Sequence, residues 1–205
     1  MTGGVIETRA ERLLPPSRKP YAEIAWWGMV LFIMSEGAMF AYFLASYFYL
    51  GVANPSWPPA GTEKPKLALP LIMTALLVTS SIVLYLGEKS YENDKRGAYR
   101  IGVIVTLALG IGFLLLQWRE YHDKLQHVSP TEHAYESLFF TITSFHGAHV
   151  AIGLLILAWT LLRETTGWID PDRPVAIHVS SLYWHFVDVV WLAIIVCIYL
   201  SPRFY

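Results

Sequence analysis

Long apolar runs alternate with short polar segments along the whole of this chain. Five of the runs reach the length of roughly 20 residues that a helix needs to cross a bilayer, and they lie at about 24–50, 67–86, 99–118, 138–162 and 180–200. Strands of a membrane barrel would be half as long and would alternate in polarity, so these runs predict helices. The expected fold class is therefore all-α, a polytopic membrane protein with a bundle of five transmembrane helices.

The segments between the runs are short and contain residues that interrupt helices. Proline and asparagine are concentrated in 54–59, after the first run, and further breakers follow at 129–132 and 170–172. None of these stretches is large enough for a soluble domain. We expect residues 1–23 to form an N-terminal tail and residues 24–205 to form one five-helix domain. The first run is too long for a signal core and has no small-residue cleavage site after it, so the tail is expected to be uncleaved.

Lysine and arginine are distributed unequally between the two sets of connecting segments. The tail, the 87–100 segment and the 163–179 segment together hold ten of them, whereas the segments of the other side hold five. Because cytoplasmic loops of membrane proteins carry the excess of positive charge, the count predicts a cytoplasmic N-terminus and a C-terminus outside.

The overall composition narrows the functional classes. Hydrophobic residues make up 55% of the chain, charged residues make up 15%, and the formal net charge is −1. A nucleic-acid partner would need a basic surface, so none is expected. The single cysteine, Cys197, excludes an internal disulfide and a cysteine metal cluster, and its expected role is packing near a helix end.

Glu36 lies near the middle of the first run, where a carboxylate costs about 2.5 kcal/mol or more unless it is protonated, paired or hydrated. Desolvation favours the neutral acid, so Glu36 is expected to be protonated at neutral pH. Two interpretations stay open: a proton or ligand site, or a buried hydrogen bond that joins helices. Gly37, Ala41 and Ala45 recur at every fourth position and predict a close helix contact beside this intramembrane carboxylate.

Two further runs carry pairs of polar residues three positions apart. His146 and His149 share one face of the fourth run, and His185 and Asp188 share one face of the fifth. Two histidines at this spacing can ligate a metal, but no cysteine and no His-x-x-x-His pair strengthens that interpretation. We therefore favour a structural polar network between the last two helices, formed by these four residues. No catalytic residue and no metal site is predicted.

Gln117, Arg119 and Glu120 end the third run. The plain interpretation is a cluster of charges at the membrane interface, within which an arginine–glutamate pairing would be ordinary. The alternative is a specific role in docking another subunit or in binding a phospholipid headgroup. Trp184 and Trp191 of the fifth run are grouped with Arg119 and Glu120 as candidate lipid or interface contacts.

Four segments together resemble subunit III of the haem–copper oxidases, the family that includes cytochrome c oxidase subunit 3. They read GMVLFIMSE at 28–36, LLQWREY at 115–121, FHGAHV at 145–150 and YWHFVDVVW at 183–191. Their order is that of the family, and the resemblance extends from about residue 28 to the C-terminus. Within the family the chain is similar to the short five-helix bacterial form.

This resemblance implies a non-catalytic subunit of a bacterial aerobic terminal oxidase that reduces oxygen to water and pumps protons, located in the cytoplasmic (inner) membrane. Haem and copper would belong to partner subunits, with none bound by this chain. The chain would contact mainly subunit I, together with subunit II, and would stabilise the catalytic core. It would also hold phospholipids along an oxygen route and support proton uptake. Glu36 matches the family's intramembrane carboxylate, which is associated with carbodiimide reactivity.

The chain departs from the family's long form in two places. The seven-helix form begins with two further helices, which make one wall of a lipid-filled V-shaped cleft; some bacterial oxidases carry their equivalents at the end of subunit I. Lipid ligands on those helices cannot be transferred here. In addition, the chain reads Tyr85-Leu86-Gly87-Glu88 where the long form typically has a pair of histidines.

Other functional classes fit less well. Subunit III of a quinol oxidase, with quinol rather than cytochrome c as electron donor, and an accessory protein of nitric oxide reductase both stay within the resemblance. A stand-alone transporter would favour broken helices and inverted repeats, whereas the runs here are unbroken and no half repeats the other. A small intramembrane metalloenzyme would need a fuller ligand set.

Overall fold

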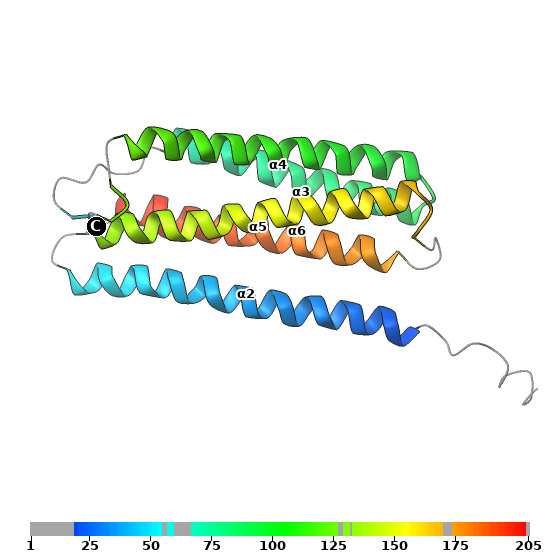
Figure 1. Cartoon of the computed structure of the whole chain (residues 1–205), viewed down its shortest axis with the longest axis horizontal. Coiled ribbons are helices and arrows are strands. Elements are labelled where there is room, and N and C mark those ends of the chain that lie inside the picture. The colour runs from blue at the N-terminus through cyan, green and yellow to red at the C-terminus, as the bar shows by residue number, and fades with distance from the viewer. Residues whose placement is uncertain are drawn as a thin grey trace, which may run out of the picture.

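The computed structural model describes residues 19–54, 57–59, 67–126, 129–131, 133–169 and 174–203. Five long helices account for nearly all of them (Figure 1): α2 (Lys19–Ala53), α3 (Ala68–Glu92), α4 (Arg96–Leu125), α5 (Ala134–Thr165) and α6 (Val175–Ile194). The last continues into a π-helical segment η1 (Ile195–Leu200) and a 3-10 turn η2 (Ser201–Arg203). No strand occurs among the described residues, and all five helices are long and apolar enough to cross a membrane. The all-α fold class is confirmed.

Each helix is longer than the apolar run that predicted it, when α6 and η1 are taken together as one span, Val175–Leu200. The helix α4 runs from Arg96 to Leu125, whereas its run covered only 99–118. The reason is that hydropathy marks the part of a helix inside hydrocarbon, while the helical hydrogen bonds continue into polar residues beyond it. Residues 1–18 of the expected N-terminal tail lie outside the described residues.

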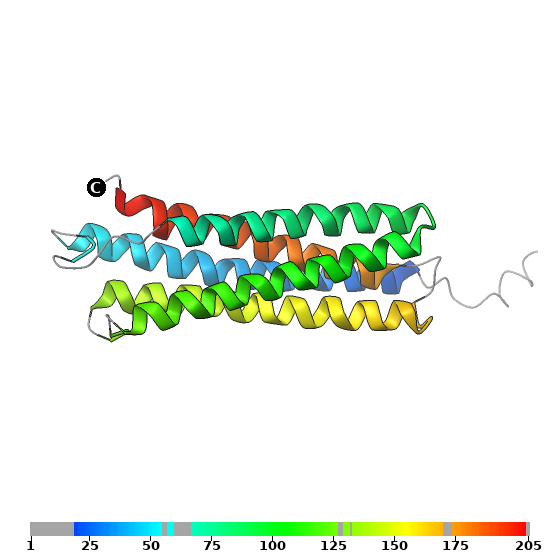
Figure 2. The ribbon, with the colours of Figure 1, turned by 90° about the horizontal axis from the view of Figure 1, so that it is seen from above.

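The helices run up and down along one common axis. The start of α2, the turn between α3 and α4, and the start of α6 lie at one end, and the C-terminal end of the chain lies at the other (Figure 2). The α3–α4 turn spans three residues and is closed by backbone hydrogen bonds from Asn93 and Lys95 to Ser90 O, at 3.2 and 2.9 Å. Asp94 adopts a positive φ of 58° there, a conformation that aspartate tolerates better than most residues.

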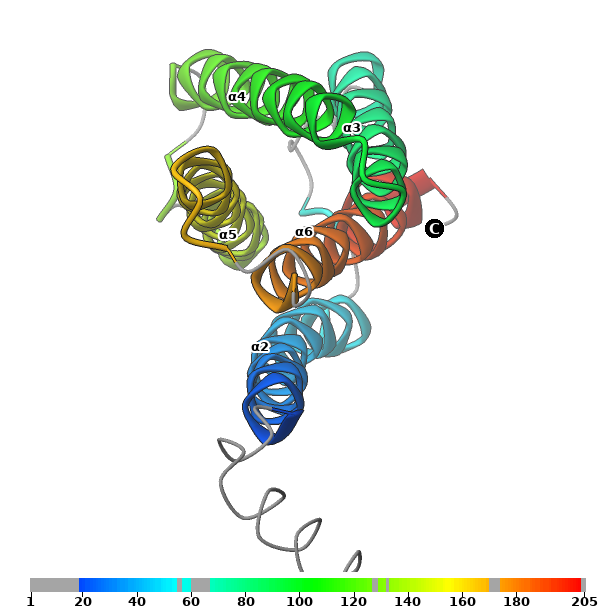
Figure 3. The same ribbon diagram turned by 90° about the vertical axis from the view of Figure 1, so that its right-hand side faces the viewer.

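Helices α3 to α6 form the main bundle, and α2 packs outside it against α6 and α5 (Figure 3). Within the bundle, α3 and α4 approach closely where Gly87 faces Gly102. A Cβ added at Gly102 would lie 3.2 Å from the Cα of Gly87, so glycine is what permits this spacing.

Helix α6 is the most enclosed element and α2 is the least. Of the most apolar part of each span, 56% of residues are buried in α6 but only 6% in α2. Trp184 of α6 lies between two glycines: a Cβ added at Gly110 of α4 or at Gly153 of α5 would lie 2.8 or 2.9 Å from its ring. Its Nε1 donates to Ser80 Oγ of α3 at 3.0 Å. One side chain thus contacts three other helices.

The contact face of α2 differs from the expected one. The expected face was the line of small residues Gly37, Ala41 and Ala45. Ala41 and Ala45 are exposed, and of the three only Gly37 faces a neighbour, Phe186 of α6. The buried positions are instead Phe40 and Tyr47. Small residues allow close approach but do not require it, and the aromatic stripe buries more apolar area than the alanines would.

Candidate functional site

The polar residues of α6 face α3. His178, Ser181, His185 and Asp188 recur at intervals of three and four, so they lie on one side of the helix. Ser81 of α3 is the meeting point in the middle of the span: its hydroxyl lies 2.9 Å from His185 Nδ1 and donates to Asp188 Oδ2. Asp188 is buried. The serine therefore joins the imidazole and the carboxylate within one cluster.

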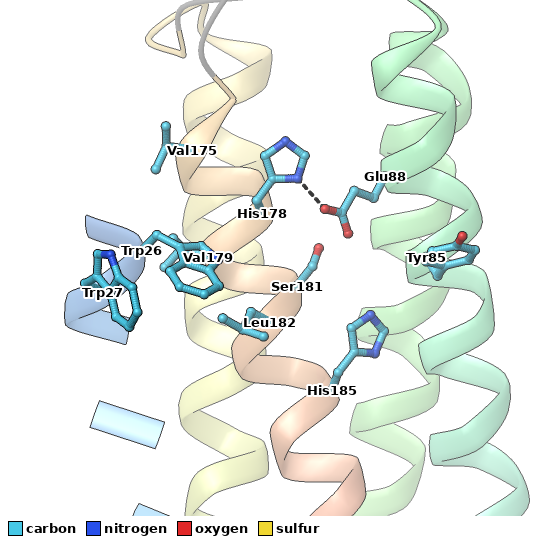
Figure 4. A pocket seen from close by; sticks show the side chains of 10 residues that line it. All are labelled: Trp26, Trp27, Tyr85, Glu88, Val175, His178, Val179, Ser181, Leu182 and His185. Atoms are coloured by element: carbon cyan, nitrogen blue, oxygen red, sulfur yellow. Dashed lines mark hydrogen bonds and ion pairs between the residues drawn. The ribbon is translucent and has the colours of Figure 1, made fainter. Parts of the chain in front are cut away.

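A second contact joins the same two helices about two helical turns from that cluster. Glu88 of α3 bonds His178 Nδ1 of α6. Between this pair and the Ser81 cluster is a cavity of about 610 Å³, bounded on one side by Trp26 and Trp27 of α2. Figure 4 shows Glu88, His178 and His185 turned toward the space between α3 and α6.

Glu36 of α2 contacts His149 of α5. Its Oε2 lies 3.1 Å from His149 Nε2, and both side chains are mostly buried. Nδ1 of the same ring lies 2.7 Å from Phe145 O. A carbonyl only accepts, so Nδ1 carries a hydrogen. Nε2 then either accepts from a protonated Glu36 or, in an imidazolium, donates to a carboxylate. In both states the pair has no net charge, which suits its depth in the membrane.

The four residues expected to form one network are divided among three places. His149 bonds α2, while His185 and Asp188 bond α3. His146 is fully buried and neither ring nitrogen has a hydrogen-bond partner. Its ring instead stacks on Trp191, with 5.0 Å between centroids. Residues three apart share a helix face, but the rotation of each helix in the bundle decides which neighbour that face meets.

Trp184 and Trp191 are not lipid or interface contacts, because both are buried inside this chain. Trp191 Nε1 donates to Thr74 Oγ1 of α3 at 3.0 Å, which matches the bond from Trp184 to Ser80. A buried indole requires an acceptor for its N–H, and small hydroxyl residues of α3 provide both acceptors.

At the C-terminal end of α4, two of the three polar residues singled out in the sequence are buried within the chain and one is exposed. Glu120 is buried and binds Lys124 Nζ at 3.1 Å and the Tyr199 hydroxyl at 3.2 Å. Its carboxylate is therefore engaged within the chain and is not a docking contact. Gln117 is buried and donates to Thr143 O at 2.6 Å. Arg119 is exposed, so the interface role expected of it stays a prediction.

Several partners in these contacts were not expected from the sequence. Ser81 sits beside Ser80 in an apolar run, and a serine there usually bonds its own helix. The pair Arg100–Glu164, which joins α4 to α5 with Nε–Oε2 at 2.7 Å, was also missed. An arginine and a glutamate near helix ends are common in any membrane protein, so neither position carried a distinguishing signal.

The chemistry of these contacts is that of hydrogen bonding between helices. No group of three or more histidine, cysteine or acidic side chains placed to hold a metal ion occurs in the part of the chain that the structure describes. The arrangement defines a class of protein: a multi-pass helical membrane protein whose buried histidines and carboxylates join neighbouring helices.

Comparison with known proteins identifies the family. The family model described as cytochrome c oxidase subunit III matches residues 21–202. A cytochrome c oxidase subunit 3 from a Synechocystis strain is 33% identical over 181 residues, covering 88% of this chain and 77% of the relative. The protein of that name from Thermostichus vulcanus is 30% identical over 202 residues, covering 98% and 99%. That of Dugong dugon is 36% identical over 179 residues, covering 84% and 68%. The chain belongs to the cytochrome c oxidase subunit III family.

Proposed function

We propose that this chain is the non-catalytic third subunit of a bacterial cytochrome c oxidase, which stabilises the catalytic core and supports its supply of protons and oxygen. The observation that carries the proposal is the family match over residues 21–202, which contains all four diagnostic segments. The chain is a multi-pass membrane protein and part of an oxidase complex with other subunits. The third subunit of a quinol oxidase is not favoured, because the relatives are named for cytochrome c.

The finer parts of the proposal follow from the charge pattern and the family. The main contact is subunit I, with subunit II nearby and phospholipids between the helices. The N-terminus lies in the cytoplasm of a bacterium and the C-terminus outside, in accord with ten basic residues on one side against five on the other. Haem and copper are held by the partner subunits. In accord with this assignment, His149, His178 and His185 are hydrogen-bonded to side chains of other helices within this chain.

Purification through a tag on this chain in a mild detergent tests the proposal. We expect a haem-containing subunit I and a copper-containing subunit II to copurify, and reduced cytochrome c to sustain oxygen consumption. Activity with a quinol but not with cytochrome c would contradict the assigned donor. The chain expressed without partners should contain no haem or copper by metal analysis, and a stoichiometric amount of either would overturn the non-catalytic role.

Removal of this subunit tests the supporting role. We expect an oxidase that starts active and then loses activity during turnover, because slower proton delivery prolongs reactive intermediates at the oxygen-reducing centre. Oxygen consumption is followed over time with and without the chain, at matched haem content. An immediate and complete loss of activity with intact haem spectra would place an essential group here. Identical time courses would mean that the chain neither supplies protons nor protects the core.

A further inference from the structure

A continuous series of polar side chains follows the contact between α3 and α6 from the membrane end inward. It begins with Glu88 and His178, passes Ser181 and His185, and ends at Asp188 in the interior. Apart from Asp188, these residues line the cavity of about 610 Å³ (Figure 4). Five groups able to carry or bond a proton thus occupy one file, although apolar side chains would fill the same contact more favourably in a membrane.

Two polar atoms along this file have no protein partner. They are Ser181 Oγ and Asp188 Oδ1, and both residues are more than nine-tenths buried. A buried hydroxyl or carboxylate oxygen is satisfied by ordered water when no protein group serves it. Ser181 also lines the cavity, which is large enough for several water molecules.

We propose that the cavity between α3 and α6 is a water-filled inlet, through which the Asp188–Ser81–His185 cluster exchanges protons with the aqueous phase at the end of the membrane where α6 begins. Ser81 can pass a proton in either direction, because its hydroxyl is in hydrogen-bond reach of both His185 Nδ1 and Asp188 Oδ2. The inlet is a property of this chain and does not depend on the electron donor of the complex.

The inlet has a closed inner end. Beyond Asp188 the next turn of α6 presents Trp191, which is buried and bonded to Thr74. Trp184 fills the adjoining space between α4 and α5 and is bonded to Ser80. Protons therefore enter and leave on the same side, and the inlet stores or exchanges them without conducting them across the membrane. A metal ion is not the occupant that the geometry suits, because the described residues contain no group of three suitable ligands.

The polar and charged groups that face His185 come from two helices. Helix α3 contributes Glu88 and the hydroxyls of Tyr85 and Ser81, and α6 contributes His178 and Asp188. Among the side chains of α2 that the structure describes, the indoles of Trp26 and Trp27 line the cavity. His185 thus lies between two carboxyl groups, Glu88 toward the membrane end and Asp188 toward the interior.

Deuterium exchange at the carbon between the two imidazole nitrogens tests the proposal on the intact complex. That hydrogen exchanges only where the ring becomes protonated and hydroxide reaches it. His122, which is exposed at the end of α4, is the fast reference, and His146, which is fully buried, is the slow one. We expect His185 to exchange roughly ten-fold or more faster than His146, with a rate that rises with pH and then levels off. Exchange at His185 as slow as at His146 would overturn the inlet and would mean that lipid or another subunit fills the cavity.

Labelling with a charged, membrane-impermeant thiol reagent tests which side the inlet opens to. In a Cys197→Ser background, Leu182→Cys lies in the cavity lining, whereas Leu86→Cys is an exposed position of α3 nearer the membrane end. Asn93→Cys in the α3–α4 turn marks the aqueous side. We expect Leu182→Cys to label roughly ten-fold faster than Leu86→Cys, and from the same side as Asn93→Cys, since thiols react as thiolates in water. Labelling no faster than at Leu86→Cys, or only from the opposite side, would contradict the proposal.

Discussion

Helix α2 and the bundle of α3 to α6 are held by different means. The bundle is joined by buried tryptophans set against glycines, with Trp184 bonded across to α3 and packed between α4 and α5. Helix α2 has most of its apolar surface exposed and packs mainly against α6 and α5, through Phe40, Tyr47 and the Glu36–His149 pair. In a membrane the exposed side of α2 meets lipid or another subunit without the cost that water would impose.

The position of a residue in the bundle therefore decides how strongly its substitution affects helix packing. Association of helices in lipid depends on close packing and hydrogen bonds, since lipid chains are as apolar as the side chains. A substitution at the packed centre should therefore disturb the packing of four helices, whereas a substitution on α2 should weaken only the attachment of α2 to the bundle. Substitutions in the two regions can test this difference.

The largest effect is expected from Gly110→Val, which places a side chain against the ring of Trp184. The Cβ alone would lie 2.8 Å from that ring and 2.6 Å from Leu154, so α4, α5 and α6 would have to separate. Overpacking of this kind costs roughly 1–3 kcal/mol or more. Mass spectrometry of the purified complex should find the subunit largely lost. The matched control is Gly28→Val on α2, where nothing lies within 4 Å; equal losses from both variants would contradict the comparison.

A smaller effect is expected from Asp188→Ala, which breaks the α3–α6 cluster without adding bulk. Ser81 would lose the acceptor of its hydrogen bond, at about 1–3 kcal/mol for an unsatisfied buried group. Retention of the subunit and its thermal stability should fall, while the haem spectrum of the remaining core stays normal. Asp188→Asn keeps an acceptor for Ser81 and should weaken retention less. Normal occupancy and stability, combined with a changed metal spectrum, would disprove the structural role.

The smallest effect is expected from Glu36→Gln on α2. The amide can donate to His149 Nε2 as a protonated acid does, so assembly and subunit retention should be close to normal. Glu36→Leu removes the donor and should lower thermal stability by about 1 kcal/mol. If Glu36→Gln abolished assembly of the whole complex, an obligatory charged pair would be the better description, and α2 would matter as much as the bundle.

Much of this protein could be predicted from local patterns in the chain. The five apolar runs give the number and type of the helices, because a segment in lipid must satisfy its backbone internally whatever surrounds it. The four diagnostic segments point to the family for a similar reason, since each is read along the chain. The spacing of the polar pairs on α5 and α6 also puts each pair on one face of its helix.

Local patterns in the chain do not reveal which helix face meets which neighbouring helix. His146 and His149 share a face, yet one ring stacks on Trp191 and the other bonds Glu36. Tryptophan is common at membrane interfaces, but Trp184 and Trp191 lie in the core. The helical period fixes angles within one helix, whereas rotation and tilt between helices are set by the sum of all side-chain contacts. The partners of these residues, and with them the file of polar groups between α3 and α6, therefore depend on how the five helices pack together.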